Sequence, residues 1–324
     1  MTTPNRLFKY VSFTPRVLQQ LCMGEVHFAD PSTFNDPLDC RPTVNADLEI
    51  PDLKEVLAQL IVRRVSKEVS DAMKKLRFKS ESIATRQEIM GNKVFETLVA
   101  NIQYEATNPD VADAEEHIRF ALGNAIEFEL RKAYDQGVLC LSSKFNSPLM
   151  WSHYADQHRG ICIEFDVSKL PEGSVREVKY GDSREVSASA VQNWLRNDSP
   201  AARQEIERAC LLTKSTEWGY ESEYRLLGTI GVQLAPATVK AITFGMKCEG
   251  TLQYAVIASL GGRDSPLEFF EINQPGARFE LTRSSVNVDE MMAGMPRINI
   301  RDEFEILDTS SDVATDSSHM PPRV

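Results

Sequence analysis

Apolar and polar residues follow two different periods along the chain, and these periods divide it into segments. Short apolar runs typical of strands occur before residue 31 and again after residue 136, as in "LFKYVSF", "VLCLSS", "GICIEFD" and "YRLLGTIGV". Over residues 51–136, and again over about 188–212, apolar residues recur at helical spacing. The mixture predicts an α+β fold, with a mixed β-sheet core and a helical insertion at 51–136 that lies against a sheet.

One predicted helix follows a strand-like run in the middle of the chain. Ser147 is a good N-cap and Pro148 a good first helical residue. Gly160 is suited to ending a helix, so the expected helix is Leu149–Arg159, with about three turns.

Composition limits the classes of function. The 324 residues, 42% apolar and 26% charged, predict a single folded domain over 1–308. The polar, small-residue end at 309–324 is expected to be a disordered tail. A net charge of −11 argues against a broad electrostatic grip on nucleic acid or anionic membrane, although a small basic groove is compatible with it.

Cysteine spacing and hydropathy indicate a compartment. The six cysteines form no CxxC pair, which disfavours a metal knuckle and fits reduced thiols. No signal-peptide core and no apolar run long enough to cross a bilayer is recognised. A cytoplasmic protein with no membrane partner is expected, and no metal site is predicted.

The segment "WGYESEYR" at residues 218–225 sets charged residues at alternate positions. Extended backbone over Trp218–Leu227 is predicted, and its alternation places Glu221, Glu223 and Arg225 on one face. Same-face neighbours are about 6.6 Å apart, so Arg225 is expected to pair with Glu223 and to leave Glu221 freer. Two interpretations stay open: an ion-paired strand face, or a site where a glutamate stabilises positive charge or takes a proton.

Aromatic and imidazole side chains crowd the predicted helix in "WSHYADQH". Trp151 and Tyr154 fit either core packing or ligand binding, and His153 fits either a hydrogen-bonded structural role or a chemical one. His153 and His158 are separated by a rotation of roughly 140°, which disfavours a two-histidine metal site on this helix.

Further polar candidates lie near the amino terminus and before the glutamates. Lys9 in "FKY" is either an edge-strand charge that prevents aggregation or a cation that faces a phosphate. Asn35 and Asp36 precede a proline, as in many turns. Lys214 either belongs to the same site as the glutamates or is a solvent-facing loop residue, and the solvent-facing interpretation is slightly favoured.

The order of four segments resembles the bacterial DUF2971 family of unknown function, from about Leu7 to Gly245. These are "FKY", "FADPSTFNDPLDC", "LCLSSKFNSPLMWSHYADQHRGICIEFD" and "KSTEWGYESEYR". The order of elements is also similar to that of NAD-dependent ADP-ribosyltransferases, including their DNA-modifying toxin branch. In this comparison Lys9 or Tyr10 corresponds to that family's polar residue in the first strand. Ser142 and Ser143 correspond to the small residues of its second strand, and Glu223 to its late-strand glutamate.

This second resemblance implies an ADP-ribosyltransferase-like fold with NAD as substrate. Glu223 is expected to stabilise positive charge on the ribose as nicotinamide leaves, with Glu221 as a paired acid. His153 is expected to bind or deprotonate the acceptor. The residues expected to bind NAD are Lys9, Tyr10, Asn35, Asp36, Ser142, Trp151, Tyr154 and Arg225.

The leading hypothesis is therefore an ADP-ribosyltransferase that acts as a toxin or antiviral defence effector on a protein or nucleic-acid acceptor. A hydrolase or nuclease that uses Glu221, Glu223 and His153, with or without a metal, is the competing enzyme. A module that senses a nucleotide or phage component without turnover is the third alternative.

Overall fold

The structure is a computed structural model that describes residues 4–76, 83–134, 136–181, 183–261 and 266–294. The chain forms two compact units, residues 1–285 and 286–324. In the second unit, the described part contains α9 (Val288–Gly294). The tail predicted at 309–324 lies outside the described residues. None of the described helices combines the length and the apolar composition that crossing a bilayer requires.

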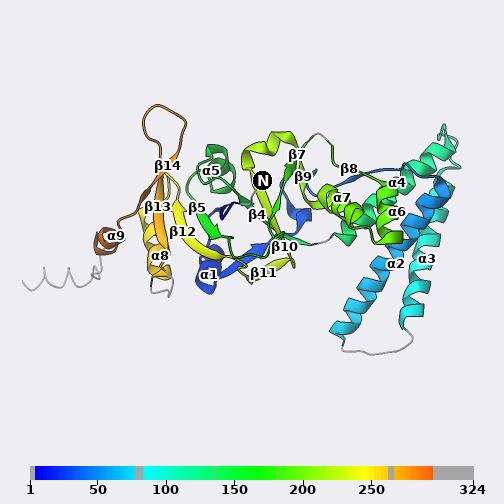
Figure 1. The fold of residues 1–324 in the computed structure, drawn as a ribbon, viewed down its shortest axis with the longest axis horizontal. Coiled ribbons are helices and arrows are strands. Elements are labelled where there is room, and N and C mark those ends of the chain that lie inside the picture. The colour runs from blue at the N-terminus through cyan, green and yellow to red at the C-terminus, as the bar shows by residue number, and fades with distance from the viewer. Residues whose placement is uncertain (1–3, 77–82, 135, 182, 262–265, 295–324) are drawn as a thin grey trace, which may run out of the picture. The chain divides into compact units, whose positions relative to one another are not determined.

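A mixed sheet forms the centre of the first unit (Figure 1). Among the described residues it has eight strands in the order β14-β13-β12-β5-β1-β4-β10-β6. Strands β12 and β13 are parallel, and the other neighbours are antiparallel. The bounds, in sheet order, are β14 (Thr282–Ser285), β13 (Glu268–Asn273), β12 (Thr238–Phe244), β5 (Ile161–Asp166), β1 (Arg6–Val11), β4 (Gly137–Ser142), β10 (Glu223–Gly228) and β6 (Arg176–Glu177).

Shorter strands and helices lie beside this sheet and beside the long helices described below. Three two-stranded pairs are β2 (Glu25–Phe28) with β11 (Gly231–Leu234), β3 (Thr43–Asn45) with β8 (Glu185–Ser187), and β7 (Lys179–Tyr180) with β9 (Thr213–Lys214). The helical pieces on this side are α1 (Pro15–Met23), η1 (Pro31–Thr33), α5 (Pro148–Tyr154), η2 (Thr216–Glu221) and α8 (Gly250–Leu260). The predicted α+β class with a mixed sheet is confirmed, and the ADP-ribosyltransferase-like arrangement stays a prediction.

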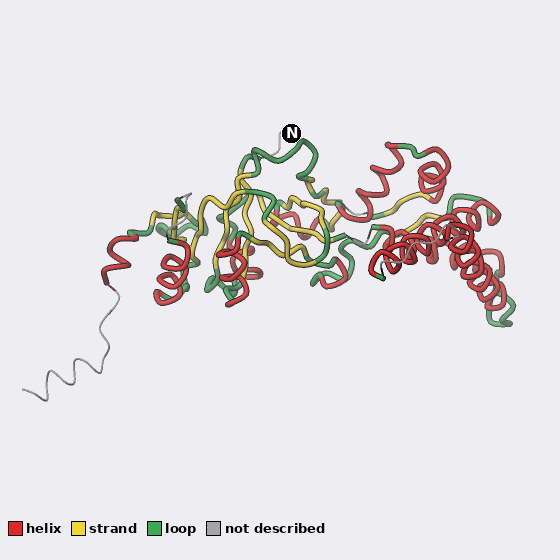
Figure 2. The backbone as a smooth tube through the Cα atoms, turned by 90° about the horizontal axis from the view of Figure 1, so that it is seen from below, coloured by secondary structure: helices red, strands yellow, loops and turns green. Residues whose placement is uncertain are grey.

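Long helices occupy the segments where apolar residues recur at helical spacing. They are α2 (Ile50–Lys75), α3 (Ile83–Glu105), α4 (Ala114–Ala133), α6 (Ala188–Asn197) and α7 (Pro200–Leu211), drawn in red in Figure 2. The helical insertion does lie against a sheet as expected, but that sheet is the two-stranded β3–β8 pair, whose Val44 and Val186 pack in the helical core. The insertion's apolar residues pack on one another and on α6 and α7, and the main sheet adds only the partly buried Leu227 to this core. The apolar faces of these helices bury one another and thereby form a core separate from that of the main sheet.

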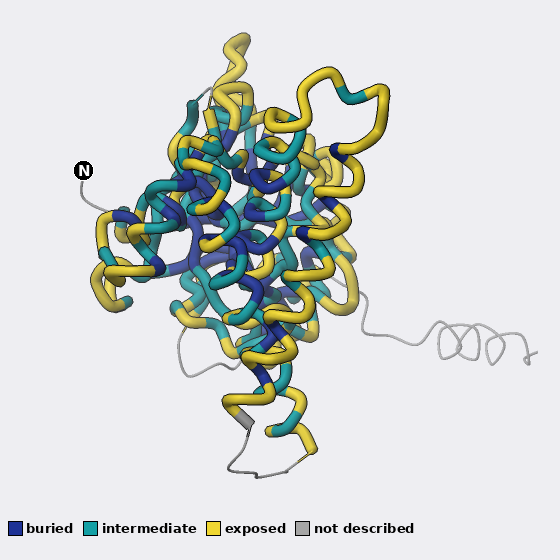
Figure 3. The backbone as a smooth tube through the Cα atoms, turned by 90° about the vertical axis from the view of Figure 1, so that its right-hand side faces the viewer, coloured by how far each residue is buried: buried dark blue, intermediate teal, exposed yellow. Residues whose placement is uncertain are grey.

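The long helices are buried along part of their length and exposed along the rest (Figure 3). Leu53, Leu57, Ile61 and Ile126 are completely buried in the helical core, whereas the far ends of α2 and α3 are exposed. Packing in the helical core thus depends on the part of α2 nearest its N-terminus.

Two neighbouring strands of the main sheet diverge, and this positions the candidate site. Strand β1 pairs with β5 along all of its residues, from Arg6 to Val11, but with β4 only at Phe8 and Ser142. Neighbouring strands stay about 4.8 Å apart only where they are hydrogen-bonded. A cavity of about 460 Å³ is lined by residues of both strands where the pairing is missing. We call it the sheet pocket.

Candidate functional site

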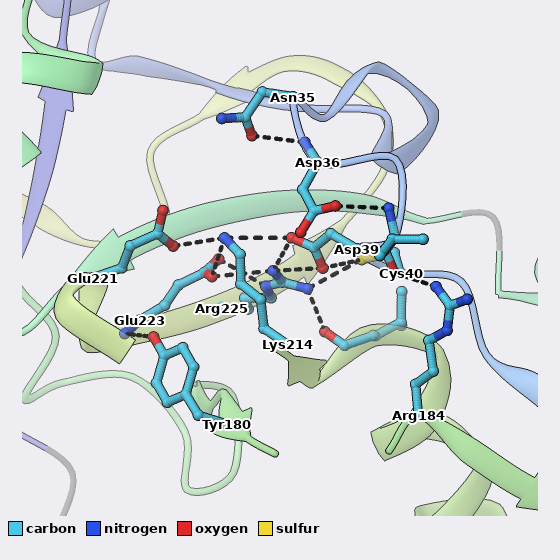
Figure 4. Close-up of polar contacts among 12 residues, drawn as sticks. Asn35, Asp36, Asp39, Cys40, Tyr180, Arg184, Lys214, Glu221, Glu223 and Arg225 are labelled. Carbon is cyan, nitrogen blue, oxygen red and sulfur yellow. Dashed lines mark hydrogen bonds and ion pairs between the residues drawn. The ribbon is translucent and has the colours of Figure 1, made fainter. Parts of the chain in front are cut away.

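Five charged residues form one buried group beside the sheet pocket: Asp39, Lys214, Glu221, Glu223 and Arg225, here called the Arg225 cluster. Each is at most 7% exposed. Figure 4 shows their charged groups converging from the loop after η1, from β9, from η2 and from β10. Three carboxylates face two cations, so the cluster retains one unbalanced negative charge. Such groups are tolerated inside a protein only when paired and hydrogen-bonded.

Arg225 holds the cluster together. Its Nε donates to Glu223 Oε1 at 2.7 Å, and its Nη2 donates to Asp39 Oδ2 at 2.7 Å. Nη2 also donates to Glu223 Oε2 at 3.1 Å, while Nη1 donates to the Leu211 carbonyl at 2.8 Å and to Cys40 Sγ at 3.0 Å. The five N–H groups of the guanidinium therefore have acceptors. The expected pairing of Arg225 with Glu223 is present, inside the protein rather than on an exposed face.

Lys214 joins the two glutamates. Its Nζ lies 2.6 Å from Glu221 Oε2, 3.4 Å from Glu223 Oε2 and 3.5 Å from Asp39 Oδ2. The prediction that Lys214 faces solvent is wrong, because strand β9 turns its side chain inward, where it is 7% exposed. The segment "LLTKSTEW" contains no periodic signal for this, because Glu221 and Glu223 lie just beyond it and Asp39 comes from the loop after η1.

The predicted strand over Trp218–Leu227 is also wrong in its first half. Residues up to Glu221 form the 3-10 helix η2, and Ser222 adopts a left-handed conformation with φ of 46°. Strand β10 begins only at Glu223. Glu221 is therefore not a same-face strand neighbour of Glu223, and it is not free: Tyr154 donates to its Oε1 at 2.6 Å.

The two glutamates differ in their electrostatics although they are equally buried. For Glu223, burial alone raises the pKa, but the charge and hydrogen bonds of Arg225 and the charge of Lys214 outweigh it and hold the pKa at about 2. For Glu221, burial is the larger effect and raises the pKa despite Lys214 and the Tyr154 hydrogen bond. Environments that push two carboxyl pKa values apart are typical of sites that assign them different roles.

A mostly aromatic wall faces Glu221 across the sheet pocket. Tyr154, His153, Met150 and Phe34 line it. The His153 ring lies 6.4 Å from the Tyr154 ring and 6.1 Å from the Tyr220 ring. This arrangement offers a flat, partly apolar surface next to a carboxylate.

Lys9 lines the sheet pocket from β1. It is partly exposed, and no described residue forms a hydrogen bond or ion pair with its amine. Burial lowers the pKa of Lys9, although the Cys140 thiol and the Glu223 carboxylate nearby act in the opposite direction. An unpaired amine on a pocket wall is suited to an anionic group of a ligand.

Other residues expected to bind NAD have structural partners. Tyr10 and Ser142 line the pocket, but the Tyr10 hydroxyl donates to the Lys144 carbonyl at 2.8 Å and Ser142 Oγ donates to the Glu221 carbonyl at 2.6 Å. Asn35 also lines it and contacts the Tyr154 hydroxyl at 3.5 Å.

Three expected ligand-binding residues do not line the pocket. Arg225 lies behind Glu223 in the cluster, and Asp36 accepts from the Leu38 N–H at 2.8 Å. Trp151 is completely buried, and its Nε1 donates to the Phe145 carbonyl at 2.8 Å. Trp151 thus belongs to the core, which leaves Tyr154 as the residue of that pair next to the pocket.

The helix predicted over Leu149–Arg159 ends early, because α5 stops at Tyr154. Asp156, Gln157 and His158 have positive φ values of 46°, 51° and 71°. The tight turn brings Gly160 against β1, where a Cβ would lie 2.3 Å from the Val11 carbonyl oxygen. His158 therefore lies beyond the helix, and the rotation expected between His153 and His158 on one helix does not apply.

Asp39 and Phe34 are site residues that the sequence interpretation missed. Asp39 belongs to the cluster and also lines the sheet pocket, and Phe34 lies under the Arg225 guanidinium at 5.5 Å. Both belong to "FNDPLDC", in which only Asn35 and Asp36 were predicted as site residues. In the described part of the chain, no three His, Cys, Asp or Glu side chains form a group suited to holding a metal ion.

Comparison with known proteins places part of the chain in a family. The family model described as a protein of unknown function, DUF2971, matches residues 150–226. The family prediction is confirmed over this range, which holds α5, Lys214, both glutamates and Arg225, but not β1 or the loop after η1. Searches of curated proteins and of solved structures gave no significant match. The family description names no activity, so function rests on the site.

Proposed function

We propose that this chain, which matches the DUF2971 family over residues 150–226, binds NAD in the sheet pocket and transfers its ADP-ribose group. The observation that carries the proposal is the unequal pair at the pocket wall, in which Glu223 is locked by Arg225 and Glu221 faces the cavity. A pocket of about 460 Å³ falls within the roughly 300–1,000 Å³ range typical of small-molecule sites.

The proposal moves the main chemical role from Glu223 to Glu221. Breaking the nicotinamide–ribose bond leaves the bonding electrons with nicotinamide and builds positive charge on the ribose, which a nearby carboxylate stabilises. Glu223 is held by the guanidinium of Arg225 and by Lys214, whereas Glu221 accepts from Lys214 and from the Tyr154 hydroxyl at the pocket. Glu221, oriented by Tyr154, is the carboxylate next to the aromatic wall.

The remaining pocket residues supply binding and proton transfer in this proposal. The unpaired amine of Lys9 attracts the anionic pyrophosphate of NAD, and Tyr154 presents its ring to nicotinamide. His153 accepts the proton that the acceptor loses when it attacks the ribose carbon. The acceptor, protein or nucleic acid, is left open.

Nicotinamide release from NAD tests the proposal. We expect Glu221→Gln to lower the rate about 10²- to 10³-fold, the effect of losing one group that stabilises transition-state charge. The matched control is Glu217→Gln, an exposed glutamate in the same 3-10 helix, which should leave the rate within about twofold.

Different outcomes separate the alternatives. Wild-type protein that neither releases nicotinamide nor gains thermal stability with NAD would contradict the proposal. NAD binding without release would favour the sensing module. Phosphodiester or ester hydrolysis that Glu221→Gln abolishes, with no effect of NAD, would favour the hydrolase.

A further inference from the structure

A second cavity, of about 210 Å³, shares Asp39 with the sheet pocket. Its walls come from the end of α4, the end of α7 and the loop from Asp30 to Arg41. We call it the basic pocket, because Arg41, Arg131 and Lys132 line it together with Phe128. None of these four residues belongs to the site described above.

The three cations of the basic pocket are unpaired. No described residue forms an ion pair or a hydrogen bond with the charged groups of Arg41, Arg131 or Lys132. The Nε atom of Arg131 is buried without a hydrogen-bond partner. In a chain of net charge −11, cations have many carboxylates available, so three that converge without an ion pair indicate a place for an external anion.

Two carboxylates, Asp30 and Asp39, line the same cavity, and the charge of Lys132 lowers the pKa of Asp30 after the larger effect of its hydrogen bonds with Ser32. Asp30 accepts from the Ser32 N–H at 2.8 Å and thereby caps η1. Asp39 accepts two hydrogen bonds from Arg225, at 3.0 and 2.7 Å. The basic pocket thus presents net positive charge to a ligand, with hydrogen-bond donors on two arginines and a lysine.

Phe128 adds a flat apolar surface at this cavity. Its side chain is 45% exposed, so the ring is open to a ligand. The Arg131 guanidinium lies 5.8 Å and the Lys132 amine 6.0 Å from the ring centroid. An exposed ring flanked by cations suits a planar base that carries a phosphate.

We propose that the basic pocket binds a nucleoside monophosphate, with the phosphate held by Arg41, Arg131 and Lys132 and the base stacked on Phe128. The cavity is smaller than the roughly 300 Å³ of a pocket that encloses a whole ligand, so it takes the phosphate end and leaves the base at the exposed ring. A terminal phosphate carries about −1.5 to −2 charges at neutral pH, which matches three cations better than a singly charged phosphodiester does. The site does not rest on NAD chemistry in the sheet pocket.

Binding of AMP to the full chain at low salt, followed by calorimetry, tests this proposal. We expect AMP to bind at least about tenfold more tightly than adenosine, since charge-assisted hydrogen bonds contribute about 1.5–3 kcal/mol each. The double variant Arg131→Gln/Lys132→Gln should lose at least about tenfold in AMP affinity. The matched control Lys67→Gln/Lys93→Gln removes two exposed charges from α2 and α3 and should change it less than about twofold.

Two further binding measurements test which part of the ligand each residue contacts. Phe128→Ala should abolish the preference for AMP over ribose 5-phosphate, because only AMP has a base to stack. A single-stranded oligonucleotide without a terminal phosphate should bind more weakly than AMP, and tighter binding would overturn the assignment to a monoester.

The same measurements distinguish this site from the sheet pocket. AMP affinity that is unchanged in Arg131→Gln/Lys132→Gln but reduced in Lys9→Gln would place AMP in the sheet pocket and overturn the proposal. Equal affinities for AMP and adenosine would overturn it as well. Failure of nicotinamide release leaves these expectations unaltered.

Discussion

The Arg225 cluster and the basic pocket share Asp39, but their charged groups differ in whether they have partners within the protein. In the cluster, every charged group has a partner inside the protein, and Arg225 is completely buried. In the basic pocket, Arg41, Arg131 and Lys132 have no ion-pair partner among the described residues. Satisfied charges hold a structure in one arrangement, whereas unsatisfied ones are available to a ligand.

This difference makes the cluster the more sensitive region for stability. We expect Arg225→Met to lower the free energy of unfolding by about 3–5 kcal/mol, because Asp39 and Glu223 stay buried and lose the guanidinium, with only Lys214 as a remaining cation. Urea unfolding followed by circular dichroism measures the change. Arg196→Met, which breaks a surface pair with Asp52 and Glu55, is the matched control and should have a much smaller effect. Equal losses in both variants would contradict the comparison.

The pH dependence of stability separates the two glutamates within the cluster. The folded-state pKa of Glu223 is about 2 against an ordinary 4.5, so the stability it contributes is present above about pH 4.5 and is lost as pH falls toward 2. The difference corresponds to about 3 kcal/mol. The pKa of Glu221 is raised, so ionising this residue destabilises the fold and its contribution has the opposite sign.

Unfolding between pH 2 and pH 6 measures this contrast. The stability difference between wild type and Glu223→Gln should shrink by about 3 kcal/mol as pH falls through this interval. Glu221→Gln should keep the acid loss of the wild type. A Glu223→Gln profile parallel to that of the wild type would show that Arg225 does not hold this carboxylate ionised.

The smallest effect is expected in the basic pocket. Arg131→Gln/Lys132→Gln should change the free energy of unfolding by less than about 0.5 kcal/mol, because neither side chain has an ion pair to lose. The measurement is the same urea titration, without ligand. A loss of unfolding free energy comparable to that of Arg225→Met would show that these cations stabilise the fold, and would contradict a role in binding an external anion.

Local sequence signals predicted the elements that depend on local interactions. Ser147 caps α5 by accepting from the Met150 N–H, and Pro148 is its first residue. The pairing of Glu223 with Arg225 was also predictable, because side chains that are two residues apart on a strand lie on the same face. In each case the atoms that decide the outcome are close in sequence.

Predictions failed where distant contacts outweigh local preference. The helix from Leu149 ends at Tyr154 because Gly160 must pass close to the Val11 carbonyl of β1. The side chain of Lys214 lies inward because β9 pairs with β7 and because the bend after η2 places Glu221 and Glu223 near its amine. Neither arrangement leaves a periodic pattern that a single sequence displays.

The sequence by itself determined the α+β class and the start of α5, because these follow from periodicity and capping. Tertiary structure alone decided that "WGYESEYR" bends at Ser222, so that η2 delivers Glu221 to the sheet pocket while β10 holds Glu223 against Arg225. The physical reason is desolvation. Buried charges must find partners, and those partners come together only when the chain folds.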